Sequence, residues 1–91
     1  MLIKGIVIDQ ETERKIFEKH SVLPKEIEKV LEEDKPLFKK VGGNQYVAIG
    51  LAERYLTIFF KYDGLIKEAR VATAYPSSKI QIKSYRRKIT K

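Results

Sequence analysis

The alternation of apolar segments and short turns in the second half of this chain constrains its fold most strongly. The apolar, β-branched segments lie at 37–41, 45–52, 55–62 and 67–75, and the turns between them are Gly42-Gly43-Asn44, Glu53-Arg54 and Asp63-Gly64. Glycine and asparagine tolerate the positive φ that tight hairpins need. Because short turns join strands that run antiparallel, the sequence predicts a sheet of sequential hairpins.

The first part of the chain has a helical period instead. Asp9 is placed to cap a helix that runs to about His20, because a short carboxylate accepts hydrogen bonds from free backbone N–H groups. Pro24 suits the first turn of a second helix, which runs to about Asp34. The stripe that this helix is expected to bury is Ile27, Val30 and Leu31. A strand is expected ahead of both helices, over residues 2–8.

The segment after Pro76 fits two structures. A helix would have Ser77 or Ser78 as its cap and an apolar face formed by Ile82, Tyr85 and Ile89. An edge strand would alternate isoleucines with polar side chains. We favour the helix. The whole chain, 1–91, is then one α+β domain in which two N-terminal helices pack on a twisted, mostly antiparallel sheet, with a basic C-terminal helix.

Positive charge is concentrated at the C-terminal end. Seven of the 19 Lys and Arg residues lie in 70–91, which has no acidic residue, and the other 12 balance the 12 acidic residues, so the net charge of +7 belongs to this segment. A polarised basic surface typically meets a polyanion, and we take RNA as the partner. The residues expected to contact RNA are Lys19, Lys79, Lys83, Tyr85, Arg86, Arg87 and Lys88. An ordinary solvated face is the alternative.

The composition also excludes several kinds of site. The chain has no cysteine, so it has no disulfide, thiolate metal site or cysteine nucleophile. One histidine and scattered carboxylates give no metal-ligand spacing, and no glycine-rich nucleotide loop is present, so we expect neither metal nor cofactor. No stretch approaches the roughly 20 apolar residues that span a bilayer, and the N-terminus lacks the features of a signal peptide. We expect a soluble, cytoplasmic protein.

Cleavage of RNA without a metal needs a base, an acid and cations that stabilise the doubly charged phosphorane. His20 is the only histidine and therefore the natural acid or base, although a histidine at a helix end can simply interact with the helix dipole. Arg70 and Arg54 are candidates for binding phosphate, because the planar guanidinium binds two oxygens at once. For Arg54 a role in the turn is the alternative.

Thr73 and Tyr75 alternate with Ala74 on the expected strand 67–75, so they share a face, together with Val71. In a functional site, Tyr75 would donate a proton or stack on a base, and Thr73 would bind a phosphate oxygen. An ordinary half-buried strand face is the alternative.

These motifs resemble those of the BrnT-type toxins, small ribonucleases of toxin–antitoxin pairs whose fold is similar to that of RelE and barnase. Lys19 and His20 match the turn between two helices. Arg70, Thr73 and Ala74 match a strand end, and Tyr85 follows eleven residues after Ala74. The segment from Thr73 to Pro76 is also similar to the last strand of colicin-like ribonuclease domains.

Two positions depart from the BrnT pattern: Tyr75 stands where the family usually has Arg, and Gln81 where it usually has Glu. The resemblance implies an endoribonuclease that cleaves RNA, with mRNA the expected substrate, by attack of the 2′-OH to leave a cyclic phosphate. It implies His20 as acid or base, Arg70 as the phosphate clamp, and an antitoxin as partner. The departures favour a non-catalytic RNA- or ribosome-binding module. A third interpretation is a basic surface that binds an acidic protein, and the acidic second helix would also permit a homodimer.

Overall fold

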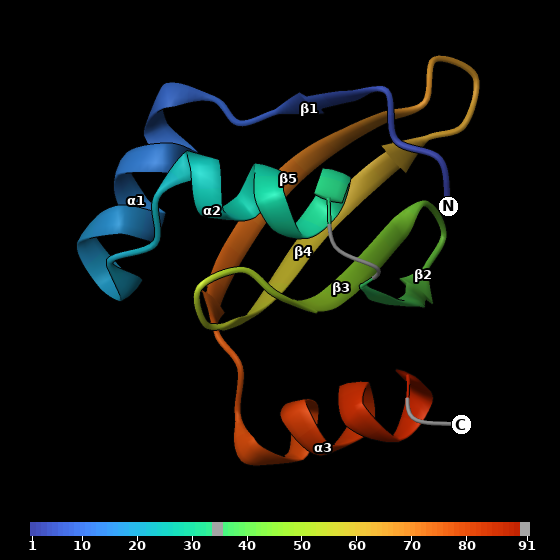
Figure 1. Ribbon diagram of the computed structural model, residues 1–91. Coiled ribbons are helices and arrows are strands. Elements are labelled where there is room, and N and C mark those ends of the chain that lie inside the picture. The colour runs from blue at the N-terminus through green and yellow to red at the C-terminus, as the bar shows by residue number, and fades with distance from the viewer. Residues whose placement is uncertain (34–35, 90–91) are drawn as a thin grey trace.

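The computed structural model describes residues 1–33 and 36–89, which form a five-stranded mixed sheet with helices on both sides (Figure 1). The elements are β1 (Gly5–Val7), α1 (Gln10–His20), α2 (Pro24–Glu28), a π-helical turn η1 (Lys29–Glu33), β2 (Leu37–Gly42), β3 (Gln45–Leu51), β4 (Tyr55–Asp63), β5 (Glu68–Pro76) and α3 (Lys79–Ile89). The strand order is β1-β5-β4-β3-β2, and only the β1–β5 pair is parallel. The predicted α+β class with sequential hairpins is confirmed, and Gly43 has the positive φ, 52°, that the first hairpin needs.

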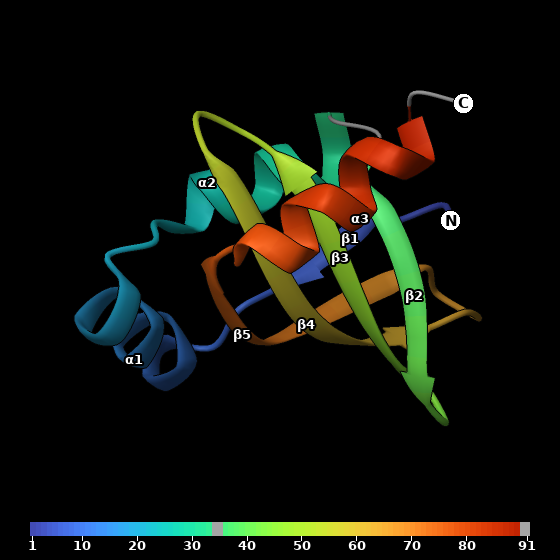
Figure 2. The ribbon, with the colours of Figure 1, turned by 90° about the horizontal axis from the view of Figure 1, so that it is seen from below.

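The hydrophobic core lies between α2, η1 and one face of the sheet. Phe60, Leu56 and Ile58 of β4 are at most 1% exposed and belong to one cluster with Ile27 and Val30. Figure 2 shows α3 across the opposite side of the sheet, so α2 and α3 lie on different faces. The first helix, α1, lies beside β5 and contributes Ile16 to the core. Both N-terminal helices therefore contribute side chains to one core, and α1 does so from beside β5.

The ends of the N-terminal elements differ from the prediction. The first strand is only Gly5–Val7, because its partner β5 begins at Glu68, which pairs with Gly5. At the other end Asp9 starts the helix: its Oδ1 accepts from the Thr12 N–H at 2.8 Å. The second helix ends as an α-helix at Glu28 and continues as η1, a wider turn in which Val30 and Leu31 remain buried. Its predicted end, Asp34, lies outside the described residues.

A β-bulge in β5 changes which side chains share a face. Phe59 pairs with Thr73 and Phe60 pairs with Val71, so Ala72 is an extra residue in β5. A bulge of one residue reverses the alternation of side chains beyond it. Val71 is therefore buried in the core, at 3% exposure, while Thr73 points to the opposite face. The prediction that Val71 shares a face with Thr73 and Tyr75 was wrong for this reason.

The C-terminal segment is a helix, as favoured, and the edge-strand alternative was wrong. Ser78 caps it reciprocally: the Gln81 N–H donates to Ser78 Oγ at 3.2 Å, and the Ser78 N–H donates to Gln81 Oε1 at 2.8 Å. Tyr85 holds α3 on the sheet, because its ring is 4% exposed and lies edge-on to Tyr55, with centroids 5.6 Å apart. The expectation that Tyr85 contacts RNA is therefore corrected, because its ring is buried.

Candidate active site

The site lies on the part of the α3-side face that α3 leaves uncovered. Residues paired across neighbouring strands point to the same side of a sheet. The core pair Phe60–Val71 points to the α2 side, so the pairs on either side of it, Phe59–Thr73 and Lys61–Arg70, point to the α3 side. The next pair in that direction is Thr57–Tyr75. The bulge thus places three predicted site residues, Arg70, Thr73 and Tyr75, along one exposed face.

His20 joins this face from α1. Because β1 pairs only with Glu68 to Arg70 of β5, the rest of that strand edge is open to α1. Ser21 ends the helix with a left-handed φ of 54°, and its N–H donates to the Phe17 carbonyl. The His20 ring lies next to Tyr75, with the two centroids 5.8 Å apart and the rings inclined by 48°.

Tyr75 continues this contact to Phe59, whose ring is stacked on it at 6.2 Å with an angle of 27°. His20, Tyr75 and Phe59 therefore form an aromatic row that crosses three elements, α1, β5 and β4. Beside it a shallow groove of about 270 Å³ runs between α1 and the bulge, lined by Thr12, Lys15, Ile16, Lys19, His20, Ala72 and Thr73. A base can stack on such half-exposed rings while its phosphate meets nearby cations.

The hydroxyl of Tyr75 belongs to a hydrogen-bonded network under α3. It accepts from Gln81 Nε2 at 3.0 Å. Thr57, the fully buried partner of Tyr75 on β4, donates to Gln81 Oε1 at 2.9 Å and contacts Ser77 Oγ at 2.8 Å. Sequence reasoning did not find Thr57 or Ser77, and it treated Gln81 only as a departure from a family pattern. A polar residue inside the apolar run 55–62 was the available signal for Thr57.

Arg70 lies on the same face but towards the far end of α1. Its guanidinium is 3.6 Å from Glu68 Oε1, and its side chain is 59% exposed. The Thr12 N–H and hydroxyl hold the pKa of Asp9 below its usual value, and the nearby Arg70 guanidinium adds to this effect. Arg70 is thus beside the cap of α1, whereas His20 is at the other end of a helix about 16 Å long.

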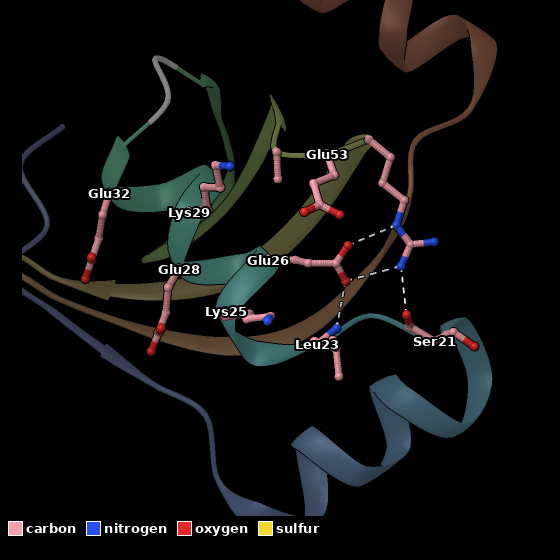
Figure 3. A pocket seen from close by; sticks show the side chains of 10 residues that line it. Ser21, Leu23, Lys25, Glu26, Glu28, Lys29, Glu32 and Glu53 are labelled. Atoms are coloured by element: carbon pink, nitrogen blue, oxygen red, sulfur yellow. Dashed lines mark hydrogen bonds and ion pairs between the residues drawn. The ribbon is translucent and has the colours of Figure 1, made fainter.

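Arg54 lies apart from the aromatic row, in the turn after β3. Its Nη2 donates to the Ser21 carbonyl at 2.7 Å and to Glu26 Oε2 at 3.3 Å, and its Nε donates to Glu26 Oε1 at 3.2 Å (Figure 3). The second carboxylate oxygen also accepts from the Leu23 N–H at 2.9 Å. Arg54 thereby ties the β3–β4 turn to the start of α2 and to the residue that follows His20.

Glu26 is largely buried under this contact, with a side chain that is 14% exposed. Burial by itself raises the pKa of Glu26, but the Leu23 N–H and the Arg54 guanidinium outweigh it and leave the pKa below its usual value. A depression of about 660 Å³ beside this pair is lined by Lys25, Lys29 and several acidic side chains, and it includes none of His20, Thr73 and Tyr75 (Figure 3). This depression is larger than the groove beside α1, but no residue of the aromatic row lines it.

Basic side chains lie beside the aromatic row, in the groove next to α1, and along α3. The exposed ones expected from the sequence are Lys19, Lys79, Lys83, Arg86, Arg87 and Lys88. Lys39 and Lys61, which the sequence analysis did not single out, are also exposed and lie on the α3 side by their register. A groove of about 300 Å³ between β2 and α3 contains Lys39, Ser84, Arg87 and Lys88. The basic surface is therefore wider than the C-terminal segment alone.

Two further findings concern other kinds of site. Within residues 1–33 and 36–89, no three His, Cys, Asp or Glu residues lie close enough together to hold a metal ion. In the same part of the chain, no helix is both long and apolar enough to cross a membrane.

Comparison of folds gives a clear match. The structure is similar to the crystal structure of the Brucella abortus ribonuclease toxin BrnT, with a TM-score of 0.67 over 82% of this chain and 97% of that one, at 18% sequence identity. No sequence-family model and no curated protein matches the chain by sequence. At this identity the match shows the fold, so the chain has the fold of a BrnT-type toxin and the resemblance seen in its motifs is confirmed at that level.

Proposed function

We propose that this protein is a metal-independent endoribonuclease of the toxin type that cleaves RNA, with mRNA as the expected substrate. The observation that carries the proposal is the contact between the only histidine, His20, and Tyr75 on an exposed basic face. The two residues lie 55 positions apart in the sequence and come from different elements. The fold shared with a ribonuclease toxin supports the same conclusion.

In the proposed reaction His20 removes the proton of the ribose 2′-OH, and the 2′-oxygen attacks the adjacent phosphorus. A bond from the 2′-oxygen to phosphorus forms as the bond to the 5′-oxygen breaks, which leaves a cyclic phosphate and a free 5′-OH. Tyr75 donates a hydrogen bond or proton on the leaving-group side, and Thr73 binds a phosphate oxygen. Positioned acids and bases of this kind contribute about 10²- to 10⁴-fold each.

Arg70, together with its cross-strand partner Lys61, supplies positive charge to the RNA from the end of α1 opposite His20. Arg54 acts at a distance in this proposal. Its hydrogen bond to the Ser21 carbonyl holds the residue next to His20, so it is a positioning residue rather than a catalytic one. The basic side chains of α3 bind the RNA backbone beyond the reacting phosphate, which makes binding strongly salt-dependent.

A ribonuclease of this type that acts in the cytoplasm requires a neutralising partner. We propose an antitoxin with an acidic or amphipathic segment that covers the basic face, since such a segment would compensate the charge and block the aromatic row.

The second candidate is a non-catalytic RNA- or ribosome-binding module on the same fold. The observation that favours it is the placement of Arg70, which is paired with Glu68 and lies beside the start of α1 rather than beside His20.

Cleavage of a mixed RNA pool in EDTA separates the two candidates. We expect the wild type and the control Lys25→Ala, an exposed cation beside the α2 depression, to leave cyclic phosphate ends. We expect His20→Ala to lose cleavage by about 100-fold or more while it still binds RNA. Equal cleavage by wild type and His20→Ala would remove His20 from the mechanism. Salt-dependent binding without cleavage by any variant would favour the binding module.

A further inference from the structure

The orientation of the Gln81 amide follows from its neighbours. A backbone N–H can only donate, and the Ser78 N–H lies 2.8 Å from one terminal atom of the Gln81 side chain, so that atom is the oxygen. The other terminal atom, which lies 3.0 Å from the Tyr75 hydroxyl, is therefore the nitrogen. Because an amide nitrogen has hydrogens but no acceptor site, the Tyr75 oxygen must accept this hydrogen bond.

Thr57 completes the network around the amide in this orientation. Its hydroxyl has one hydrogen, which goes to Gln81 Oε1, so it accepts from Ser77. Ser77 thus donates to Thr57, Thr57 donates to Gln81 Oε1, and Gln81 Nε2 donates to Tyr75. Turning the amide over would leave the Ser78 N–H facing an NH₂ group, which cannot accept from it.

The Tyr75 hydroxyl accepts a hydrogen bond in this network and does not donate its own proton there. Among residues 1–33 and 36–89, the Gln81 amide is its hydrogen-bond partner, and no acceptor for its proton is present. The ring itself is half-buried between His20 and Phe59. The O–H is therefore available to a ligand that lies on the aromatic row.

We propose that Gln81 is a positioning residue that holds the Tyr75 hydroxyl as an outward hydrogen-bond donor, so that the ligand atom received there is an acceptor oxygen, such as a phosphate oxygen of RNA. The inference rests on the proposed function for the identity of that ligand. A carboxylate at this position would keep the hydrogen bonds from Ser78 and Thr57. It would also accept the proton of the Tyr75 hydroxyl, which would then no longer be available to a ligand.

Gln81→Glu tests this directly, because the two side chains have nearly the same shape. In the ribonuclease assay we expect kcat to fall about tenfold to hundredfold with KM changed by less than about threefold. The matched control is Gln45→Glu, which adds the same charge at an exposed residue paired with Lys61, and there we expect an effect on KM and not on kcat. The inference also requires a smaller effect in the Tyr75→Phe background. There, adding Gln81→Glu should change cleavage by less than about twofold. An equal loss in both backgrounds would overturn it.

A second measurement does not depend on cleavage. In ¹⁵N spectra the side-chain NH₂ resonance of Gln81 is identified by its loss in Gln81→Glu, or in Gln81→Met if the first variant does not fold. We expect Tyr75→Phe to shift this resonance and to leave those of Gln10 and Gln45 in place. An unchanged Gln81 resonance would overturn the inference. If the wild type cleaves no RNA, the proposed function fails, and the amide resonance still decides the role of Gln81.

Discussion

The two faces of the sheet differ in how far they are covered and in how polar they are, although they share the same strands. The buried core on the α2-side face is apolar, and Phe60 of β4 is one of its members. The α3-side face is only partly covered: it carries a buried threonine, a hydrogen-bonded network and the half-exposed ring of Phe59. Consecutive residues of one strand thus belong to a stabilising face and to a candidate binding face. Under the proposed function, changes on the first face affect stability, and changes on the uncovered part of the second affect RNA binding.

The most direct test of this difference between the two faces is to truncate the two neighbouring phenylalanines. We expect Phe60→Ala to lower the free energy of unfolding by about 3–5 kcal/mol, because it leaves a cavity in the core. We expect Phe59→Ala to cost less than about 1 kcal/mol and to weaken RNA binding about tenfold through lost stacking. Urea unfolding and RNA titration measure both. Similar losses of stability in the two variants would contradict the division between the faces.

Tyr85 tests the covered part of the second face. Its ring packs with Leu37, Ile49 and Tyr55, so we expect Tyr85→Ala to cost about 2–4 kcal/mol and to increase amide hydrogen exchange throughout α3. The control is Ile80→Ala on the same helix, which is 78% exposed and should change stability by less than about 0.5 kcal/mol. If α3 exchanged at the wild-type rate in Tyr85→Ala, the helix would be held by other contacts.

The contact between Glu26 and Arg54 predicts a smaller, pH-dependent effect. Because the folded-state pKa of Glu26 is depressed, its contribution is present above the unfolded value of about 4.3 and is lost as the pH falls through the folded value. We expect Glu26→Gln to cost about 1 kcal/mol at neutral pH and progressively less as the pH falls below about 4.3. Thermal unfolding across this window measures the difference, with exposed Glu28→Gln as control. A cost that persists at the acidic end would show that the charge is not its source.

The smallest change in stability is expected on the open basic surface. Lys61→Ala and Arg70→Ala should each alter the free energy of unfolding by less than about 0.5 kcal/mol, since both side chains are exposed. Each should nevertheless reduce the slope of log binding constant against log salt by about one, because one phosphate contact is removed. Lys25→Ala should leave the slope unchanged. A slope unaffected by all three variants would place RNA on another surface.

Local chemistry made several features predictable. Asp9 and Ser78 cap their helices as their side chains suggested, since a cap needs only residues within one turn. The hairpin turns were also predictable from neighbouring residues, and the helix after Pro76 was the favoured one of two structures. The sequence placed Thr73 and Tyr75 on one face, as the structure does, but it added Val71 wrongly and did not place Arg70 there. Nothing local to β5 indicated the bulge, which the sequence accommodates at Ala72.

Long-range packing determined the rest. Whether the Tyr85 ring is buried depends on where α3 crosses β3, and whether Arg54 can meet a ligand depends on a carboxylate 28 residues away.

Local patterns in the sequence were enough to predict the class of the fold and most of the segments that form helices and hairpins. They also showed a basic C-terminal segment, which is typical of a surface that binds a polyanion. These depend on hydrophobic period, turn residues and charge, which act over a few positions. The tertiary structure decided that His20 meets Tyr75, that Gln81 donates to the Tyr75 hydroxyl, and that Phe59 and Lys61 join the same face. These contacts depend on strand register, on one bulge and on the helix that lies beside each strand, and short-range patterns carry no information about such distances.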